Sequence, residues 1–217
     1  MIKIPVEPIK QETPNDCSIT CLRMLLGYYG VKVPRQKIFD YVIKATDDGG
    51  SFLAEMARFA RNQGFNVDLC AYNLYFTGSK DAKLDKNKLL KKLEKELRNS
   101  QRDKYYDLAL ESTIKGIKEG VNYLIKRPSP EVIKSYLKKR IPVSIRINYA
   151  ALVGKQGDPF DSHDVVLSGL KDKKVYLVDP ADTSQKWFDI EEVMFAIQQS
   201  KVISASGYLL AIKQKSL

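Results

Sequence analysis

The order of two hydrophobic patterns along the chain most restricts the folds that it can adopt. In the N-terminal part, apolar residues recur at the spacing of amphipathic helices. One such stripe consists of Ile19, Leu22, Leu26 and Tyr29. In the C-terminal part, short apolar runs are separated by polar turns, which is typical of antiparallel strands. Helices followed by strands predict an α+β fold in which N-terminal helices pack on an antiparallel sheet.

The same patterns predict the individual elements. The first helix begins near Asp16 and ends at Gly30. The second begins after Pro34, and the third is capped by Ser51 and ends at Gly64. The remaining predicted helices cover residues 131–139 and 190–200, and the predicted strands cover residues 65–72, 142–149, 163–170, 175–179 and 202–212.

Residues 77–127 differ from the rest of the chain in their charge. They contain 14 lysines and arginines against 8 acidic residues, and so carry six of the ten net positive charges. Two helical stripes run through them, one of leucines from Leu89 to Leu97 and one from Leu110 to Leu124. We expect a charged helical hairpin inserted into a single domain of residues 1–217. A nucleic-acid partner is not expected, because the basic residues alternate with acidic ones and aromatic residues are sparse.

The composition restricts the class of protein. The apolar fraction of 44% is typical of a folded globular chain. No apolar run approaches the roughly 18 residues that span a bilayer, and the N-terminus does not resemble a signal peptide. Three cysteines are too few for a disulfide framework and favour a reducing compartment, so we expect a cytoplasmic protein.

The chain contains one histidine, His163, which limits the chemistry open to it. A metal site that needs two imidazoles is excluded, and an imidazole base can only be His163. The candidate nucleophile is Cys17, in the first turn of the first predicted helix, where free N–H groups and the helix dipole favour a thiolate. Cys21 and Cys70 are expected to be core residues, and we expect neither a metal nor an organic cofactor.

Two further residues complete a candidate site. Asp179 closes the predicted hairpin that His163 opens, and a separation of 16 residues allows both side chains to share a face. Such an aspartate orients the imidazole, although Asp179 followed by Pro180 is also an ordinary turn signal. Gln11 is a candidate oxyanion donor beside the backbone N–H of Cys17, or alternatively a cap for the helix.

Four blocks of the sequence resemble the bacteriocin-processing cysteine peptidases that cleave after double-glycine leaders. The blocks are Gln11 with Asp16-Cys17 and the following apolar helix, residues 48–51, residues 140–145, and the segment from His163 to Ala181. The resemblance covers the chain except for residues 77–127. It implies a papain-like fold with Cys17 as nucleophile, His163 as base, Asp179 as orienting residue and Gln11 in the oxyanion hole. The separation of 146 residues between Cys17 and His163 is similar to that of papain-like enzymes.

The sequence departs from this family in one block and in its organisation. Ser18 follows the cysteine where the family usually has glycine, and no transporter spans accompany the domain. We therefore expect a free-standing cysteine hydrolase, in the first place a peptidase acting on a peptide or protein. The double-glycine specificity is not carried over. The alternatives are an acyltransferase or amidase with the same triad, or a catalytically silent papain-like binding module whose basic insertion recruits an acidic partner.

Overall fold

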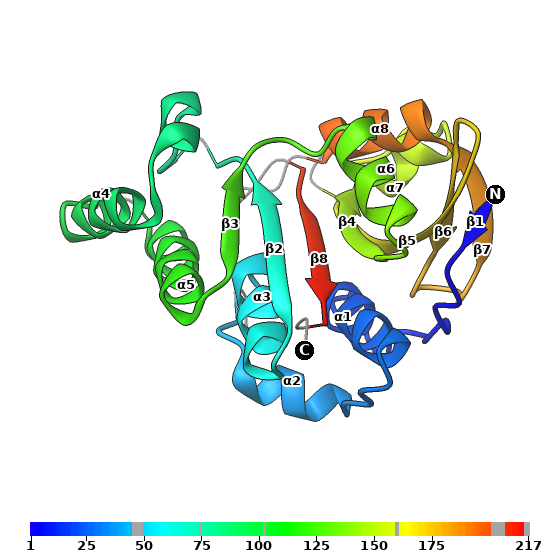
Figure 1. Ribbon diagram of the computed structural model, residues 1–217, viewed down its shortest axis with the longest axis horizontal. Coiled ribbons are helices and arrows are strands. Elements are labelled where there is room, and N and C mark those ends of the chain that lie inside the picture. The colour runs from blue at the N-terminus through cyan, green and yellow to red at the C-terminus, as the bar shows by residue number, and fades with distance from the viewer. Residues whose placement is uncertain (45–49, 74, 102, 159–160, 201–206, 215–217) are drawn as a thin grey trace.

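The computed structural model describes residues 1–44, 50–73, 75–101, 103–158, 161–200 and 207–214 (Figure 1). Its helices are α1 (Cys17–Tyr28), α2 (Arg35–Tyr41), α3 (Leu53–Asn62), the 3₁₀ helix η1 (Ser79–Lys83), α4 (Lys86–Arg98), α5 (Lys104–Glu119), α6 (Pro130–Lys138), α7 (Tyr149–Leu152) and α8 (Ile190–Gln199). Its strands are β1 (Ile2–Lys3), β2 (Asn66–Ala71), β3 (Asn122–Ile125), β4 (Val143–Ile147), β5 (His163–Lys171), β6 (Lys174–Val178), β7 (Gln185–Asp189) and β8 (Leu209–Lys213).

The described strands form one sheet that organises the molecule. Their order is β3-β2-β8-β4-β5-β6-β7, and β1 pairs with the far end of β5. The neighbours are antiparallel except for β2 and β3, which run parallel. The α+β class and the predicted antiparallel sheet are therefore confirmed, with one parallel pair at the edge. No helix within the described ranges is both long and apolar enough to cross a membrane.

Helix α1 lies at the centre of the main hydrophobic core. Eight of its twelve residues are buried, so it is enclosed on most sides rather than lying on the surface. Leu22 and Leu25 are fully buried in the same apolar cluster as Val165 of β5. Gly30 has a φ of +80°, a conformation that favours glycine, and its position after the helix agrees with the predicted end. Because the buried residues of α1 pack against the sheet, the position of the helix, including its first residue, is fixed relative to β5.

The prediction that Ser51 caps the third helix is wrong. Helix α3 begins after Phe52, and no side chain caps it. The buried hydroxyl of Ser51 instead lies 2.9 Å from the hydroxyl of Ser18 in α1. The Ser51 hydroxyl therefore bonds to Ser18, which is far away in the sequence, instead of capping the start of α3. Five residues of the preceding loop, 45–49, lie outside the described residues.

The second helical stripe predicted for the insertion extends too far. Helix α5 ends at Glu119 because Gly120 adopts a φ of +98°, and the N–H of Val121 then bonds to the carbonyl of Gly116. The next residues form β3, which pairs with β2. Apolar residues on both sides of Gly120 happen to match helical spacing, so periodicity alone could not detect the break.

Several other boundaries also differ from the prediction. The strand predicted over 142–149 ends at Ile147, because the Asn148 side chain accepts the N–H of Ala151 and begins α7. Strand β7 was not predicted, since its alternation is weak and its first two residues are exposed. Of the last predicted strand, residues 202–206 lie outside the described residues, and the strand that the structure describes, β8, begins at Leu209.

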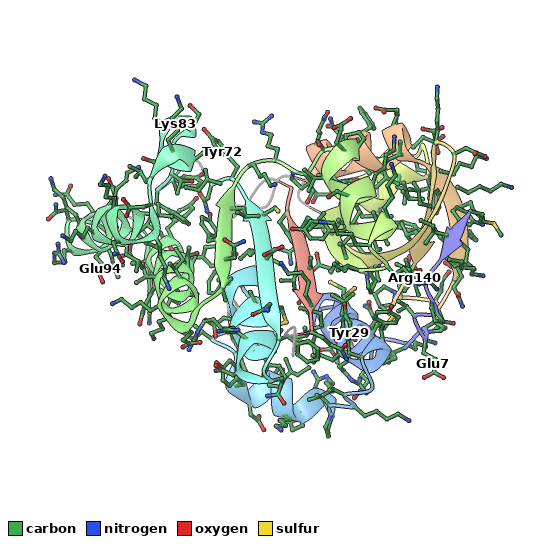
Figure 2. All side chains as sticks on the ribbon, viewed as in Figure 1. Glu7, Tyr29, Tyr72, Lys83, Glu94 and Arg140 are labelled. Carbon is green, nitrogen blue, oxygen red and sulfur yellow. The ribbon has the colours of Figure 1, made fainter. Side chains whose placement is uncertain are left out.

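The two charged helices α4 and α5 have an apolar cluster of their own. They lie beyond the β3 edge, at the far end of the molecule from β5, β6 and β7 (Figure 1). Glu94 of α4, labelled in Figure 2, joins the two helices through an ion pair with Lys118 of α5 at 2.7 Å. The buried members of the cluster are Phe76, Leu89, Leu93, Leu110, Ile114, Ile117 and Ile125. The cluster includes a residue of β3, so the helices pack directly against the end of the sheet.

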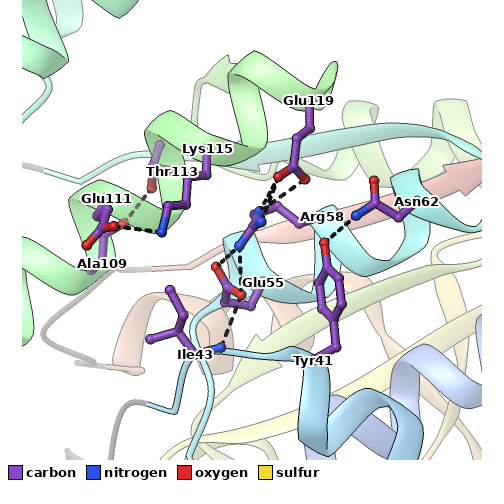
Figure 3. A network of polar contacts seen from close by, with 10 residues as sticks. All are labelled: Tyr41, Ile43, Glu55, Arg58, Asn62, Ala109, Glu111, Thr113, Lys115 and Glu119. Atoms are coloured by element: carbon purple, nitrogen blue, oxygen red, sulfur yellow. Dashed lines mark hydrogen bonds and ion pairs between the residues drawn. The ribbon is translucent and has the colours of Figure 1, made fainter.

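An ion-pair network joins α5 to α3. Arg58 of α3 lies between Glu55 of the same helix and Glu119 of α5 (Figure 3). Its guanidinium is 2.8 Å from one Glu55 oxygen and 2.6 Å from one Glu119 oxygen. Glu55 is fully buried, and it also accepts the backbone N–H of Ile43. A buried carboxylate requires such partners, so Arg58 is central to the attachment of the inserted helices.

We predict that Arg58→Ala destabilises the protein by about 3–5 kcal/mol, because it leaves the buried Glu55 carboxylate without its cation. Urea unfolding followed by circular dichroism measures this. Lys115→Ala is the matched control. Lys115 pairs with Glu111 on the exposed side of α5, and exposed pairs contribute about 0–1 kcal/mol. Equal losses in the two variants would contradict the role given to Arg58.

Candidate active site

Cys17 is the first residue of α1, and the helix start around it is not capped by a side chain. The Asp16 carboxylate turns away from the helix to accept the N–H of Thr13 at 3.1 Å and two bonds from Arg35. The Arg35 bonds measure 2.5 and 2.8 Å, and Asp16 is fully buried. The first amide N–H groups of α1 are therefore left to face the site, where they favour a negative charge.

His163 and Asp179 are brought together at the ends of adjacent strands. Nε2 of His163 lies 2.6 Å from Oδ1 of Asp179. The same Asp179 oxygen accepts the N–H of Ala181 at 2.8 Å, and Asp179 is only 2% exposed. The carboxylate is thus held rigidly. Tyr149 of α7 lies edge-on to the imidazole, with ring centroids 6.0 Å apart.

The hairpin register differs in detail from a direct pairing of these two residues. A β-bulge between Leu167 and Gly169 shifts the strands, and Val166 pairs with Val178. Asp179 therefore lies just beyond the paired strand end and diagonal to His163 on the same face. Diagonal neighbours in a sheet are within reach of long side chains. The predicted shared face is thus confirmed, although the bulge makes the two residues diagonal neighbours rather than a direct pair.

The environment of His163 changes its protonation. Burial by itself lowers its pKa, but the hydrogen bond to Asp179 and the interaction with Cys17 outweigh burial. The pKa rises from 6.5 to about 10. The histidine is therefore an imidazolium at neutral pH, and the Cys17 sulfur is close enough to bond to it.

Gln11 lies beside this group, but its side chain is directed to its own loop. Its backbone N–H bonds to the carbonyl of Pro180 at 2.8 Å, which fastens the loop to the Asp179 end of the hairpin. Its Nε2 donates to the carbonyls of Thr13 and Pro14 at 3.0 and 3.2 Å. The buried Oε1 has no partner among the described residues. Its role as an oxyanion donor remains a prediction, and it requires one amide hydrogen to leave these carbonyls.

The serine at the usual glycine position fits the structure. Ser18 is only 5% exposed, and its hydroxyl pairs with that of Ser51. A polar group buried in this way would be costly without a partner. The pair also joins the residue after Cys17 to the segment that leads into α3. The additional side chain is thus accommodated without displacing the start of α1.

A buried ion pair beneath α1 was missed by the sequence analysis. Arg146 of β4 lies opposite Asp164 of β5, and two bonds of 2.7 and 2.8 Å join them. The Arg146 guanidinium also lies 5.1 Å from the ring centre of the buried Tyr208. Burial by itself lowers the pKa of Arg146, but the charge of Asp164 and its hydrogen bonds raise this pKa well above its usual range. Only the cross-strand register brings these residues together, so no local pattern indicates the pair.

The other two cysteines are buried, as predicted. Burial raises the pKa of the Cys21 thiol well above its usual range, and the nearby Asp164 charge adds to the effect. Burial also raises the pKa of Cys70, to about 11. Within the described ranges, no three His, Cys, Asp or Glu side chains are grouped so as to hold a metal ion.

A family model described as the Peptidase_C39 like family matches residues 3–200. Because the match covers most of the chain, the chain belongs to the Peptidase_C39-like family, and the resemblance noted in the sequence is confirmed. Its fold is the papain-like α+β fold of these peptidases. No curated protein matches the chain.

Three solved structures are similar to the chain over nearly its whole length. A protein from Bacillus anthracis described as a C39-like peptidase has 17% identity, covers 100% of this chain and 98% of its own, and has a TM-score of 0.58. A double glycine motif protease from an AMS/PCAT transporter, in complex with its leader peptide, has 19% identity, coverages of 98% and 94%, and a TM-score of 0.49. The peptidase domain of Streptococcus ComA has 11% identity, coverages of 97% and 99%, and a TM-score of 0.49.

We predict that His163 titrates near pH 10 rather than near 6.5. Because the chain has one histidine, its imidazole signals in an NMR titration need no assignment. Asp179→Asn and Cys17→Ala each lower the midpoint, since each removes an interaction that stabilises the imidazolium. A wild-type midpoint near 6.5 would contradict the geometry of the site.

The same shift predicts a pH dependence of stability. Between about pH 6.5 and 10 the folded state keeps a proton that the unfolded state has released. The free energy of unfolding therefore falls as the pH rises through this window. The slope is measured in the Cys17→Ala background, because a Cys17 thiol that ionises in the folded state would release a proton over the same range and offset the effect of His163. Urea unfolding at several pH values should show the slope in Cys17→Ala, where Asp179 still raises the pKa of His163, and a shallower slope in Cys17→Ala/His163→Ala.

Proposed function

We propose that this chain is a cysteine peptidase in which Cys17, His163 and Asp179 form the catalytic triad. The observation that carries the proposal is the position of His163. It is hydrogen-bonded to a rigidly held Asp179, and it lies close enough to Cys17 for the two groups together to raise its pKa. A nucleophile beside a base that is itself held by an orienting group is the arrangement used in thiol-dependent acyl transfer. Membership of the Peptidase_C39-like family supports the same reaction.

The reaction begins from a thiolate and an imidazolium. The Cys17 sulfur attacks the carbonyl carbon of a peptide bond, and the carbonyl electron pair moves to oxygen. When the tetrahedral intermediate collapses, the C–N bond breaks and the imidazolium of His163 gives its proton to the leaving amine. A thioester remains on Cys17. The neutral imidazole then takes a proton from water, the resulting hydroxide attacks the thioester, and the C–S bond breaks to restore the thiolate.

The oxyanion is stabilised at the start of α1. The backbone N–H of Cys17 lies in the uncapped first turn and is the first donor. The Gln11 side chain is the proposed second donor, released from the Thr13 or Pro14 carbonyl when substrate enters. Asp179 holds the imidazole in one orientation and stabilises its positive charge.

The proposed substrate class is a peptide or protein, and membership of the family supports it. An amidase or acyltransferase uses the same acyl-enzyme, and the acceptor of the acyl group distinguishes them. Turnover in the presence of an ordinary amine acceptor, such as a short peptide with a free amino terminus, tests this, because a transferase forms the new amide whereas a hydrolase releases the free acid. All three cysteines are free thiols, which supports the expected location in the reducing cytoplasm.

We predict that iodoacetamide at pH 6 labels Cys17 on the order of 100-fold faster than an unperturbed thiol of pKa about 8.5. Residue-specific mass spectrometry measures the rate at each cysteine. The buried Cys21 and Cys70 serve as internal controls and should react slowly. His163→Ala should abolish the fast labelling. Equal, slow labelling of all three cysteines would contradict the proposed pair and favour the binding-module alternative.

Turnover provides the second test. The wild-type chain should cleave members of a mixed peptide library, with products identified by mass spectrometry, whereas Cys17→Ala should produce none. Gln11→Ala should lower kcat by about 10²–10³ if the side chain is an oxyanion donor. A loss of thermal stability in Gln11→Ala with kcat unchanged would instead identify Gln11 as a brace for its loop.

A further inference from the structure

The outer edge of β3 is the starting point for a second site. β3 is the last strand of the sheet and pairs with β2 on one side. On its other side, the described residues provide no backbone partner from another segment. The N–H of Lys126 bonds to the carbonyl of Leu124, but this contact is local to the turn that follows β3. An exposed strand edge of this kind can pair with an additional strand.

A cavity of about 550 Å³ lies along this edge. Its lining includes every residue from 120 to 126. Successive strand residues point to opposite faces of a sheet, so a cavity that touches all of them runs beside the backbone rather than over one face. The other lining residues belong to η1, α4, α5 and the short link between η1 and α4, among them Asp81, Leu89 and Ile117. The four residues of β3 span about 13 Å, enough for an extended segment of roughly four residues.

The wall opposite β3 is apolar and belongs to the inserted helices. Leu84, Leu89 and Ile117 line it, and the last two are only 5% and 3% exposed. A segment lying in the cavity would therefore direct alternate side chains toward an apolar surface. Neither β3 nor the inserted helices could form this cavity alone, since each provides one of its walls.

The charge of the cavity is positive. Lys86 and Lys126 line it, and neither forms an ion pair among the described residues. The acidic residue of the lining, Asp81, is already bonded to Lys92 and to the N–H of Gly78. Lysines beside a strand edge disfavour pairing with neutral or basic strands. A strand with acidic side chains is therefore the partner whose charge complements the groove.

We propose that this groove binds an extended acidic polypeptide segment by adding it as a strand to β3. Main-chain hydrogen bonds to β3 would provide affinity, alternate apolar side chains would contact the inserted helices, and acidic side chains would meet Lys86 and Lys126. The groove is distinct from the candidate active site. Four strand spacings separate β3 from β5, a distance of about 19 Å. The proposal does not depend on catalysis by Cys17.

The test uses a fluorescein-labelled eight-residue peptide of alternating valine and glutamate, and fluorescence anisotropy on the full chain carrying Cys17→Ala. This background prevents turnover and separates binding from peptidase activity. We expect saturable binding that weakens with added salt, and binding at least tenfold weaker for the same peptide with lysine in place of glutamate. No difference between the two peptides would overturn the charge argument.

Backbone pairing is tested in the peptide itself. Residues on an added strand alternate between bonding to β3 and facing away, so N-methylation of the amides of one parity should abolish binding while methylation of the other parity leaves it unchanged. Hydrogen exchange should show new protection at residues 120–126. Equal effects of the two methylation patterns, or protection confined to another region, would overturn strand addition.

The protein variants address the groove without touching the site around Cys17. Lys86→Glu and Lys126→Glu should each weaken binding about tenfold or more. Lys91→Glu is the matched control, because it makes the same charge change at an exposed position of α4 that does not line the cavity. An equal loss in all three variants would identify a diffuse charge effect and overturn the site. A dimer in light scattering that protects the β3 amides without peptide would identify a second copy of the chain as the occupant, which also overturns the proposal.

Discussion

The packing of α1 on β5 is the contact on which the candidate site depends. Both elements are almost entirely buried, and each begins with a residue of the proposed triad, Cys17 and His163. A slip of α1 by one turn would move Cys21 toward the position of Cys17. Such a slip is opposed because the Cys21 thiol is fully buried and hydrogen-bonded to Ser144 of β4. The helix register and the sheet register therefore set the distance between sulfur and imidazole together.

Each buried carboxylate around Cys17 is paired with a cationic group. Three buried carboxylates lie close to this end of α1, and each is bound to a cationic group: Asp16 to Arg35, Asp164 to Arg146, and Asp179 to His163. An uncompensated carboxylate in a buried site would oppose a thiolate on the neighbouring sulfur. The pairing removes that opposition while leaving the carboxylates free to position what they contact. Only the Asp179 pair includes the group that exchanges protons in the proposed reaction.

The inserted helices are joined to the domain by three kinds of contact. Arg58 provides ion pairs between α3 and α5, the cluster around Leu93 provides apolar packing, and β3 extends the sheet itself. Because the segment predicted as an insertion ends in a strand of the sheet, it extends the main fold rather than forming a loosely attached appendage. The same arrangement leaves β3 as an edge strand faced by helices at a distance, which is the origin of the groove.

The sequence alone determined the fold class and most helices and strands, and it singled out Cys17, His163 and Asp179, the residues of the proposed triad. Hydrophobic periodicity reports local structure, a single histidine leaves one candidate base, and a separation of 16 residues in a hairpin predicts a shared face. The tertiary structure decided what depends on long-range pairing. It gave Ser51 a partner in Ser18, turned the Gln11 amide to its own loop, and placed Arg146 opposite Asp164. It also made residues 122–125 an edge strand beside a groove. Each of these outcomes follows from contacts between segments far apart in the chain, and local spacing carries no record of which segments will meet.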